Sequence, residues 1–213
     1  MRRLSGAARM GLLAGMRALA LDTETTGMSP ASGATLVEVA WVRIENGEPV
    51  AESAPGARWA SLVNPGQPIP PDATRVHRIT DEMVAGAPGP CAVAPVLRTA
   101  CADLPLVMHN APFDLPFLQD LMRRTGQKPL DNVVVDTLGL ARGLFEGGGN
   151  SLGALAARFA LRLETAHRAL GDALTTAELL GRLAERWERD FEVRSLAELA
   201  AASQDVMRRT ARR

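Results

Sequence analysis

The amino-acid sequence predicts an α/β domain in which helices cover a mixed sheet. Three runs with strand character come first in the chain, as a meander, and helices then alternate with short apolar runs. Consecutive meander strands pair in antiparallel, whereas strands separated by helices pair in parallel, so both kinds of pairing are expected. At 213 residues the chain is long enough for one domain with a substantial core and short for two.

The first part of the chain supplies the meander. The apolar run RALALD, residues 17–22, is too short for an amphipathic helix and predicts a buried strand. Residues 35–50 alternate in polarity and contain the turn pair Asn46-Gly47, which predicts a hairpin. The returning strand is expected within ARWASLVNP, residues 57–65.

From residue 65 onward, helices and strands are expected to alternate. Prolines between Pro65 and Pro71 mark a loop, and a capping-type sequence at 80–83 opens a short helix. The remaining expected elements are a helix near 91–102, a strand at 104–109, a helix at 111–126, a strand at 132–138, a loop at 147–149, a helix at 151–159 and a long helix at 169–187.

Composition narrows the class of protein. Apolar residues make up 46% and charged residues 23%, which is typical of a soluble globular protein. The formal net charge is zero, so any contact with nucleic acid has to be local. No apolar run approaches the ~20 residues that a membrane span requires. Cys91 and Cys101 support neither a zinc site nor a disulfide framework, so the expected location is the reducing cytoplasm.

Both ends of the chain are expected to lie outside the domain, which spans residues 17–190. Residues 1–16 contain three arginines and no acid. We expect a disordered N-terminal extension, or a chain that starts at Met16, with an amphipathic targeting sequence as the alternative. Residues 191–213 form a C-terminal tail with a basic end, either helical or frayed, which could dock a partner.

Two carboxylates, Asp22 and Glu24, follow the first apolar run directly. Side chains at positions i and i+2 of a strand point to the same face, so these two project side by side. Charges that close repel each other, and one acid would hold a proton unless a cation lies between them. A divalent metal such as Mg²⁺ resolves the conflict, while a solvated turn is the alternative for these two residues alone.

Three further polar residues favour the metal interpretation. Asp114, in HNAPFD, and Asp172, in HRALGDALTT, each stand in the first turn of a predicted helix. The helix dipole alone favours negative charge there. His167 lies five residues before Asp172, in the loop that enters the long helix. Four acids and one histidine at the ends of elements form a more specific pattern than any one of them.

The motifs DTETTG, HNAPFD and HRALGDALTT, in this order, resemble those of the DnaQ-like or DEDD-type exonucleases, such as the proofreading epsilon subunit of bacterial DNA polymerase III. The resemblance spans residues 17–187. Since the chain has no tyrosine and His167 stands five before Asp172, it resembles the histidine branch, DEDDh. The implied fold is a ribonuclease H-like three-layer domain with a five-stranded mixed sheet, and residues 17–190 are then the exonuclease domain.

The resemblance implies a metal-dependent 3′-to-5′ exonuclease that hydrolyses DNA in proofreading or repair and releases nucleoside 5′-monophosphates. It implies two divalent cations, Mg²⁺ or Mn²⁺. Asp22, Glu24 and Asp172 hold one, and Asp22 helps to bridge a second near Asp114. The two cations hold the attacking water and the leaving 3′ oxygen, and His167 accepts the proton of the water. These five residues form the implied catalytic set.

Neighbouring residues are predicted to position the substrate. Thr25, Thr26 and Gly27 follow the first two acids, and the glycine would let the backbone approach the terminal sugar. The threonines could equally serve turn hydrogen bonds. His77, in VHRIT, matches a position that contacts the terminal nucleotide in the family. Arg78 follows it where many members carry glycine, so the shape of this loop stays open.

Two alternatives to a DNA exonuclease stay open. One is an RNA-trimming or oligoribonuclease-like enzyme, because motif spacing does not show how a 2′-hydroxyl would be recognised. The other is a non-catalytic module that binds nucleic-acid ends, which the presence of all five catalytic positions disfavours. The expected partner is a single-stranded or frayed 3′ end, DNA rather than RNA. A DNA polymerase subunit is a further candidate partner, and a membrane is not.

Overall fold

The sheet at the centre of the structure is mixed, as the sequence predicts. The structure is a computed structural model and describes residues 11–145, 147–161 and 167–210. Its strands are β1 (Arg17–Thr25), β2 (Leu36–Glu45), β3 (Glu48–Pro49), β4 (Arg58–Leu62), β5 (Leu106–Met108) and β6 (Val134–Asp136). The order across the sheet is β3-β2-β1-β5-β6, with β4 also paired to β2. The meander strands pair in antiparallel, and β1, β5 and β6 pair in parallel.

The short strand β3 and the strand β4 share one edge of β2. β3 pairs with the end of β2 at Ile44 and Glu45, and β4 pairs with residues 38–42. The six described strands therefore occupy five positions across the sheet, in agreement with the predicted five-stranded arrangement. Asn46 and Gly47 connect β2 to β3 with φ angles of 54° and 78°, which fits the predicted hairpin turn.

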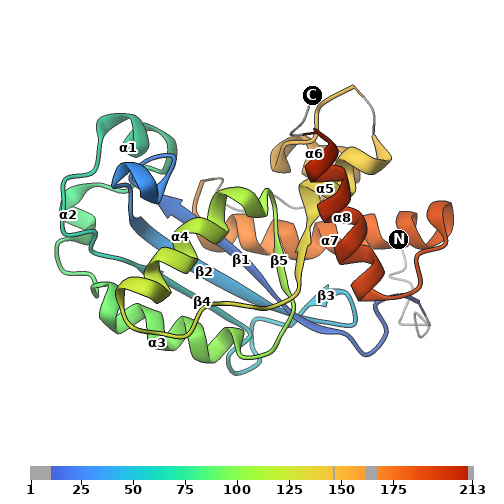
Figure 1. Cartoon of the computed structure of the whole chain (residues 1–213), viewed down its shortest axis with the longest axis horizontal. Coiled ribbons are helices and arrows are strands. Elements are labelled where there is room, and N and C mark those ends of the chain that lie inside the picture. The colour runs from blue at the N-terminus through green and yellow to red at the C-terminus, as the bar shows by residue number, and fades with distance from the viewer. Residues whose placement is uncertain (1–10, 146, 162–166, 211–213) are drawn as a thin grey trace.

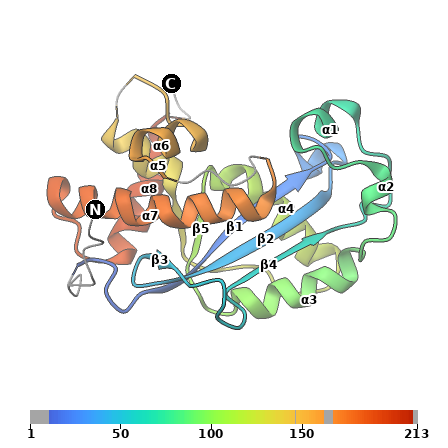
Figure 2. The ribbon, with the colours of Figure 1, turned by 180° about the vertical axis from the view of Figure 1, so that it is seen from behind.

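Helices cover both faces of the sheet, which gives the predicted three-layer, ribonuclease H-like fold (Figures 1 and 2). The helices are α1 (Pro71–His77), α2 (Asp81–Val84), α3 (Pro90–Cys101), α4 (Ala111–Arg124), α5 (Thr137–Leu144), α6 (Leu152–Phe159), α7 (Ala169–Phe191) and α8 (Leu196–Thr210), with a short 3-10 helix at Pro30–Ser32. α3 and α4 lie on one face and α7 lies on the other. α5 and α6 contact α7, and α8 contacts α5 and β6.

No helix in the described part of the chain is long and apolar enough to cross a membrane.

Residues just before β1 pack against α7. The backbone N–H of Leu12 donates to Glu188 Oε1 at 3.2 Å, and Leu13 is buried in the core under α7. The expectation of a disordered extension therefore does not hold for residues 11–16. Residues 1–10 lie outside the described residues.

The C-terminal tail, expected to be helical or frayed, contains the helix α8, which packs against α5 and β6. Ser203 of α8 is completely buried. Its hydroxyl accepts from the backbone N–H of Asp136 at 3.1 Å and donates to Ala200 O at 2.7 Å. These contacts make α8 part of the packed domain.

Replacing Gly139 of α5 by alanine should displace α8. A Cβ at this position would lie 2.2 Å from the carbonyl oxygen of Ser203, so the two helices would have to move apart. We expect the free energy of unfolding, measured by urea denaturation, to fall by about 1–3 kcal/mol. Gly153→Ala on α6 is the matched control, because an added Cβ there meets nothing within 4 Å. Equal stability of the two variants would contradict the close packing of α5 and α8.

Candidate active site

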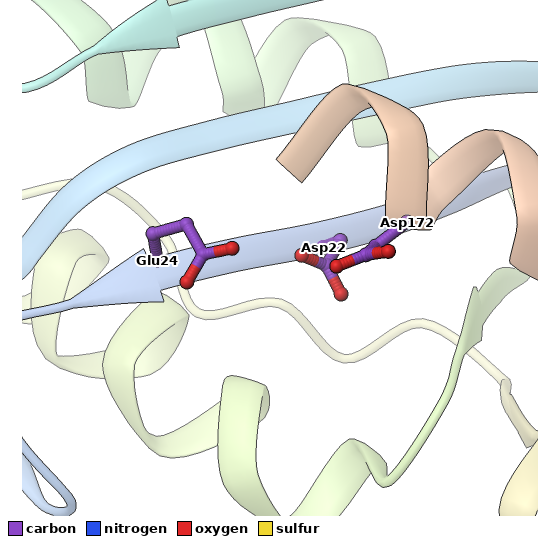
Figure 3. A group of neighbouring side chains, drawn as sticks. All are labelled: Asp22, Glu24 and Asp172. Carbon is purple, nitrogen blue, oxygen red and sulfur yellow. The ribbon is translucent and has the colours of Figure 1, made fainter. Parts of the chain in front are cut away.

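Side chains of β1 point alternately to the two faces of the sheet, and this determines which helix its acids face. Ala18 and Ala20 pack into the core cluster beneath α7, whereas Leu21 packs into the cluster beneath α3 and α4. Asp22 and Glu24 continue the first series and are half-buried on the α7 side of the sheet (Figure 3). The side-by-side arrangement expected from the sequence therefore follows from the period of a single strand.

Asp172 reaches the same place from the first turn of α7. One carboxylate oxygen each from Asp22, Glu24 and Asp172 all lie within 4.8 Å of one another, and Figure 3 shows the three side chains converging. Negative charge in this first turn is favoured by the helix dipole. The group is the set that the resemblance implies for one cation. A donor set made only of carboxylate oxygens suits a hard divalent cation.

Asp114 lies next to the same strand, on α4. Thr23 stands between the two acids of β1 and faces α4, and its hydroxyl donates to Asp114 Oδ1 at 2.6 Å. Asp114 is only 3% exposed. It is not part of the three-acid group, although its charge is close enough to raise the pKa of Asp22. A second cation between Asp22 and Asp114 stays a prediction.

His167, the predicted base, is exposed at the entry to α7. Its φ angle of 60° lies in the left-handed region. Its backbone N–H donates to Asp172 Oδ2 at 3.1 Å, which leaves the imidazole free of that contact. Residues 162–166, which precede it, lie outside the described residues.

Burial, together with the crowding of the acids, raises their pKa values. Burial, followed by the negative charge of Asp172, raises the pKa of Glu24 to about 8. Burial likewise raises the pKa of Asp114 to about 7, against the hydrogen bond from Thr23. The pKa of Asp22 is well above its ordinary value, first because of burial and next because of the charge of Asp114. Burial also raises the pKa of Asp172. These shifts predict that the metal-free cluster retains protons near neutral pH and releases them when a cation binds.

The metal-free protein should lose stability as the pH rises. An acid whose pKa is higher in the folded state binds extra protons there, so its stabilisation is present at low pH and is lost as the pH passes the folded value. With Glu24 at about 8 and Asp114 at about 7, the loss begins above the ordinary pKa values of these acids, near 4, and its last part falls between about pH 6.5 and 8.5. We expect the Tm in EDTA to fall by about 5 °C over this interval.

Controls separate this effect from other titrations. His109 is buried and its pKa is lowered from 6.5 to about 4, so its contribution to stability grows with pH up to the ordinary value and opposes the loss only at the lower end of the interval. Glu24→Gln should flatten the slope of Tm against pH. Mn²⁺ should raise the Tm more at pH 8.5 than at pH 6.5. A Tm in EDTA that stays constant or rises across the interval would contradict the raised pKa values.

The turn after β1 uses both of its threonines internally. Thr25 Oγ1 donates to Gly27 O at 2.7 Å, and Thr26 Oγ1 accepts from the N–H of Thr35 at 2.9 Å. These are the turn hydrogen bonds that the sequence left open as an alternative. A Cβ on Gly27 would lie 3.2 Å from the Cβ of Ala34, so the glycine also keeps this turn close to its neighbour. Contacts of these residues with a substrate stay predictions.

His77 stands buried at the end of α1, with 2% of its surface exposed. Its Nδ1 accepts from the N–H of Ile79 at 3.0 Å, which assigns the ring proton to Nε2. Nε2 is buried and has no hydrogen-bond partner among the described residues. Arg78 adopts a φ of 63°, the conformation for which glycine is favoured, so an arginine here takes the backbone shape that a glycine would.

Two buried acids that the motifs do not single out also support the site. Asp136, at the end of β6, accepts from the N–H groups of Asn110 and Ala111 at 3.0 and 3.1 Å and thereby fixes the start of α4. It also caps α5 through the N–H of Leu138. Glu38 is the second. Each could have been found in the sequence: Asp136 stands at the junction of a predicted strand and helix, and Glu38 is a charged residue within the apolar run LVEVAWV.

Comparison with known proteins places these features in a family. The family model RNase_T, described as exonuclease, matches residues 19–180. The chain belongs to this exonuclease family. The match confirms the resemblance to the DnaQ-like exonucleases that the three motifs indicate.

Relatives and solved structures agree with this membership. The chain is 45% identical over 165 residues to a DNA polymerase III subunit epsilon-like protein of Rhodobacter capsulatus, a match that covers 76% of this chain and 23% of that protein. It is 34% identical over 172 residues to the DNA polymerase III subunit epsilon of Rickettsia typhi, with 79% of this chain and 72% of that protein covered. The chain thus spans less than a quarter of the length of the first relative.

Two solved exonucleases share the fold. The structure of Exonuclease X in complex with 5′ overhanging duplex DNA superposes with a TM-score of 0.64 at 29% identity, over 87% of this chain and 98% of that one. The structure of E. coli Exonuclease I with a dT13 oligonucleotide superposes with a TM-score of 0.71 at 19% identity, over 83% of this chain and 43% of that one. At that identity the second comparison speaks for the fold alone.

Proposed function

We propose that the chain is a metal-dependent 3′-to-5′ exonuclease that hydrolyses the terminal phosphodiester bond of DNA and releases nucleoside 5′-monophosphates. The observation that carries this proposal is the convergence of Asp22, Glu24 and Asp172 within 4.8 Å, with Asp114 and His167 beside them. The relatives named DNA polymerase III epsilon subunits, and the duplex DNA in the Exonuclease X complex, support DNA as the substrate.

The acids would hold two divalent cations, Mg²⁺ or Mn²⁺. Asp22, Glu24 and Asp172 would hold one, and Asp22 together with Asp114 would hold the other. Bound cations supply positive charge to the phosphoryl group and make water a stronger nucleophile. The raised pKa values support this assignment, because they report carboxylates that lack enough positive charge in the protein alone.

The residues of the chain would move the proton and orient the substrate. His167 would accept a proton from the attacking water, since its imidazole is exposed beside Asp172. The backbone hydrogen bond between these two residues would keep the base in register with a metal ligand. The unpartnered Nε2–H of His77 would donate to an oxygen of the terminal nucleotide, because a buried donor without a partner costs about 1–3 kcal/mol.

Digestion of matched oligonucleotides tests the proposal. Four 5′-labelled substrates of one sequence are needed: single-stranded DNA, single-stranded RNA, and duplex DNA with a paired or a mismatched 3′ end. We expect stepwise shortening from the 3′ end in Mg²⁺ or Mn²⁺, none in EDTA, and faster shortening of DNA than of RNA. The released products should co-elute with nucleoside 5′-monophosphates.

The other possible outcomes of this digestion favour functions other than that of a DNA exonuclease. Unchanged strand length with folded protein and Mn²⁺ would remove the enzymatic proposal and leave a module that binds nucleic-acid ends. Faster shortening of RNA would favour an RNA-trimming enzyme. A proofreading role, alone or with a polymerase subunit, requires that the mismatched 3′ end be removed faster than the paired one.

A further inference from the structure

Glu38 is a charged side chain inside the sheet. It lies on β2 directly opposite Glu24 of β1 and is 3% exposed. A buried carboxylate next to other acids is costly unless positive charge and hydrogen bonds satisfy it. Both are supplied in this chain from a segment 130 residues away, at the start of α7.

Three hydrogen bonds join Glu38 to the start of α7. Arg168 Nε donates to Glu38 Oε2 at 3.1 Å and Nη2 donates to Oε1 at 2.6 Å, in a bidentate pair. The backbone N–H of Ala169 donates to Oε2 at 3.0 Å. The side chain of the N-cap residue Arg168 makes no capping hydrogen bond to α7, and Glu38 satisfies from the sheet one of the N–H groups that have no partner within the helix. We call this set of contacts the Glu38–Arg168 clamp.

The clamp acts on the same helical turn that carries the candidate ligand. The backbone N–H of Asp172 donates to Arg168 O at 3.1 Å, which closes that turn. The carboxylate of Asp172 accepts from the N–H of His167, the residue just before Arg168. A shift of Arg168 relative to the sheet would therefore move both the third carboxylate and the predicted base away from Asp22 and Glu24.

Charge balance supports the same interpretation. Glu38 adds a further negative charge to the acidic cluster, and Arg168 offsets part of it at hydrogen-bond distance. Glu38 itself helps to raise the pKa of Glu24, and Arg168 opposes that rise with a smaller effect. The pair carries no formal net charge, and it holds two elements of the site together.

We propose that Glu38 and Arg168 are positioning residues that set the distance of Asp172 and His167 from the two acids of β1. The inference rests on the proposed metal-dependent function, because its effect is exerted on the candidate metal ligands.

Glu38→Gln tests the clamp with little change in volume. Glu45→Gln is the matched control, because Glu45 lies on the same strand and pairs with Arg43 at 2.7 Å, at the end of β2 away from the acids. Mn²⁺ binding is measured by calorimetry, and kcat and KM by digestion of single-stranded DNA. We expect Glu38→Gln to weaken Mn²⁺ binding and to lower kcat by about 10- to 100-fold each, with KM for DNA little changed. Glu45→Gln should behave as wild type.

Variants of the arginine provide the second arm. The side chain of Arg168 is 39% exposed, and Arg168→Lys keeps a positive charge beside the buried Glu38, so this variant threatens folding least. Arg168→Gln should weaken Mn²⁺ binding as Glu38→Gln does, and Arg168→Lys should recover part of the loss by retaining the charge. The double variant should lose no more than the worse single one, because the pair acts as a unit. Should Glu38→Gln fail to fold, the two arginine variants carry the test.

The outcomes separate this inference from the proposed function. If wild type binds Mn²⁺ and cleaves DNA, and folded Glu38→Gln and Arg168→Gln do so equally well, the clamp has no positioning role while the exonuclease proposal stands. If wild type itself neither binds Mn²⁺ nor cleaves, both fall. A loss of kcat that extends to Glu45→Gln would also overturn the positioning role, because it would reflect a general effect of charge on β2.

Discussion

Replacement of Asp22 by asparagine should abolish cleavage and, at the same time, stabilise the metal-free protein. Asp22 belongs to the three-acid group and lies near Asp114, so its carboxylate is the one shared by both predicted cation sites. Asparagine keeps the shape but removes a negative ligand, and turnover should fall below detection. The same change relieves repulsion among half-buried acids, so the free energy of unfolding in EDTA should rise by about 1 kcal/mol.

The opposite signs of the two effects make this prediction sharp. Activity is measured on single-stranded DNA in Mn²⁺, and stability by urea denaturation in EDTA. Asp120→Asn is the matched control, because Asp120 lies on α4 but pairs with Arg123 and Arg124 at the surface and should leave cleavage intact. Undiminished cleavage by Asp22→Asn would contradict the metal assignment. Loss of both activity and stability would instead make Asp22 a structural residue.

The geometry of the first motif follows from its own sequence. Asp22 and Glu24 share a face because a strand has a period of two, and the residues before them already alternate between the two core clusters on either side of the sheet. Asp172 required the family resemblance, since no local pattern says which helix packs over which face of a sheet. The same alternation could have predicted that Thr23, which lies between the two acids, points to the opposite face of the sheet. There its hydroxyl donates to Asp114.

The parts that sequence reasoning missed depend on long-range contacts. Glu38 interrupts an apolar strand pattern, which marks it as unusual. Nothing in the sequence indicates that Arg168, which follows His167, is its partner. The C-terminal tail is packed because Gly139 and Ser203 approach each other closely. The periodicity of the sequence does not predict this contact. The backbone at Arg78 also could not be predicted. The sequence shows that glycine is absent from this position, but only the structure shows that the arginine adopts the left-handed conformation that glycine favours.

Replacement of His167 by asparagine should lower kcat by about 10² to 10⁴ without loss of Mn²⁺ binding, because it removes a general base and leaves the ligands in place. The link from residue 167 to Asp172 is a backbone N–H, which asparagine also supplies, and asparagine tolerates the φ of 60° found there. The separation of kcat from metal affinity is what distinguishes a base from a residue that only supports Asp172.

The measurements for His167→Asn are single-turnover digestion of DNA across pH and calorimetric titration with Mn²⁺. The variant should lose the limb of the pH profile that the base contributes in wild type. Asp172→Asn, which removes a predicted ligand at the start of the same helix, should lose Mn²⁺ affinity and turnover together. A kcat for His167→Asn near that of wild type would show that another group takes the proton. An equal loss of Mn²⁺ binding in both variants would show that His167 serves the geometry of α7, because a base that only accepts the proton of water has no part in holding the cation.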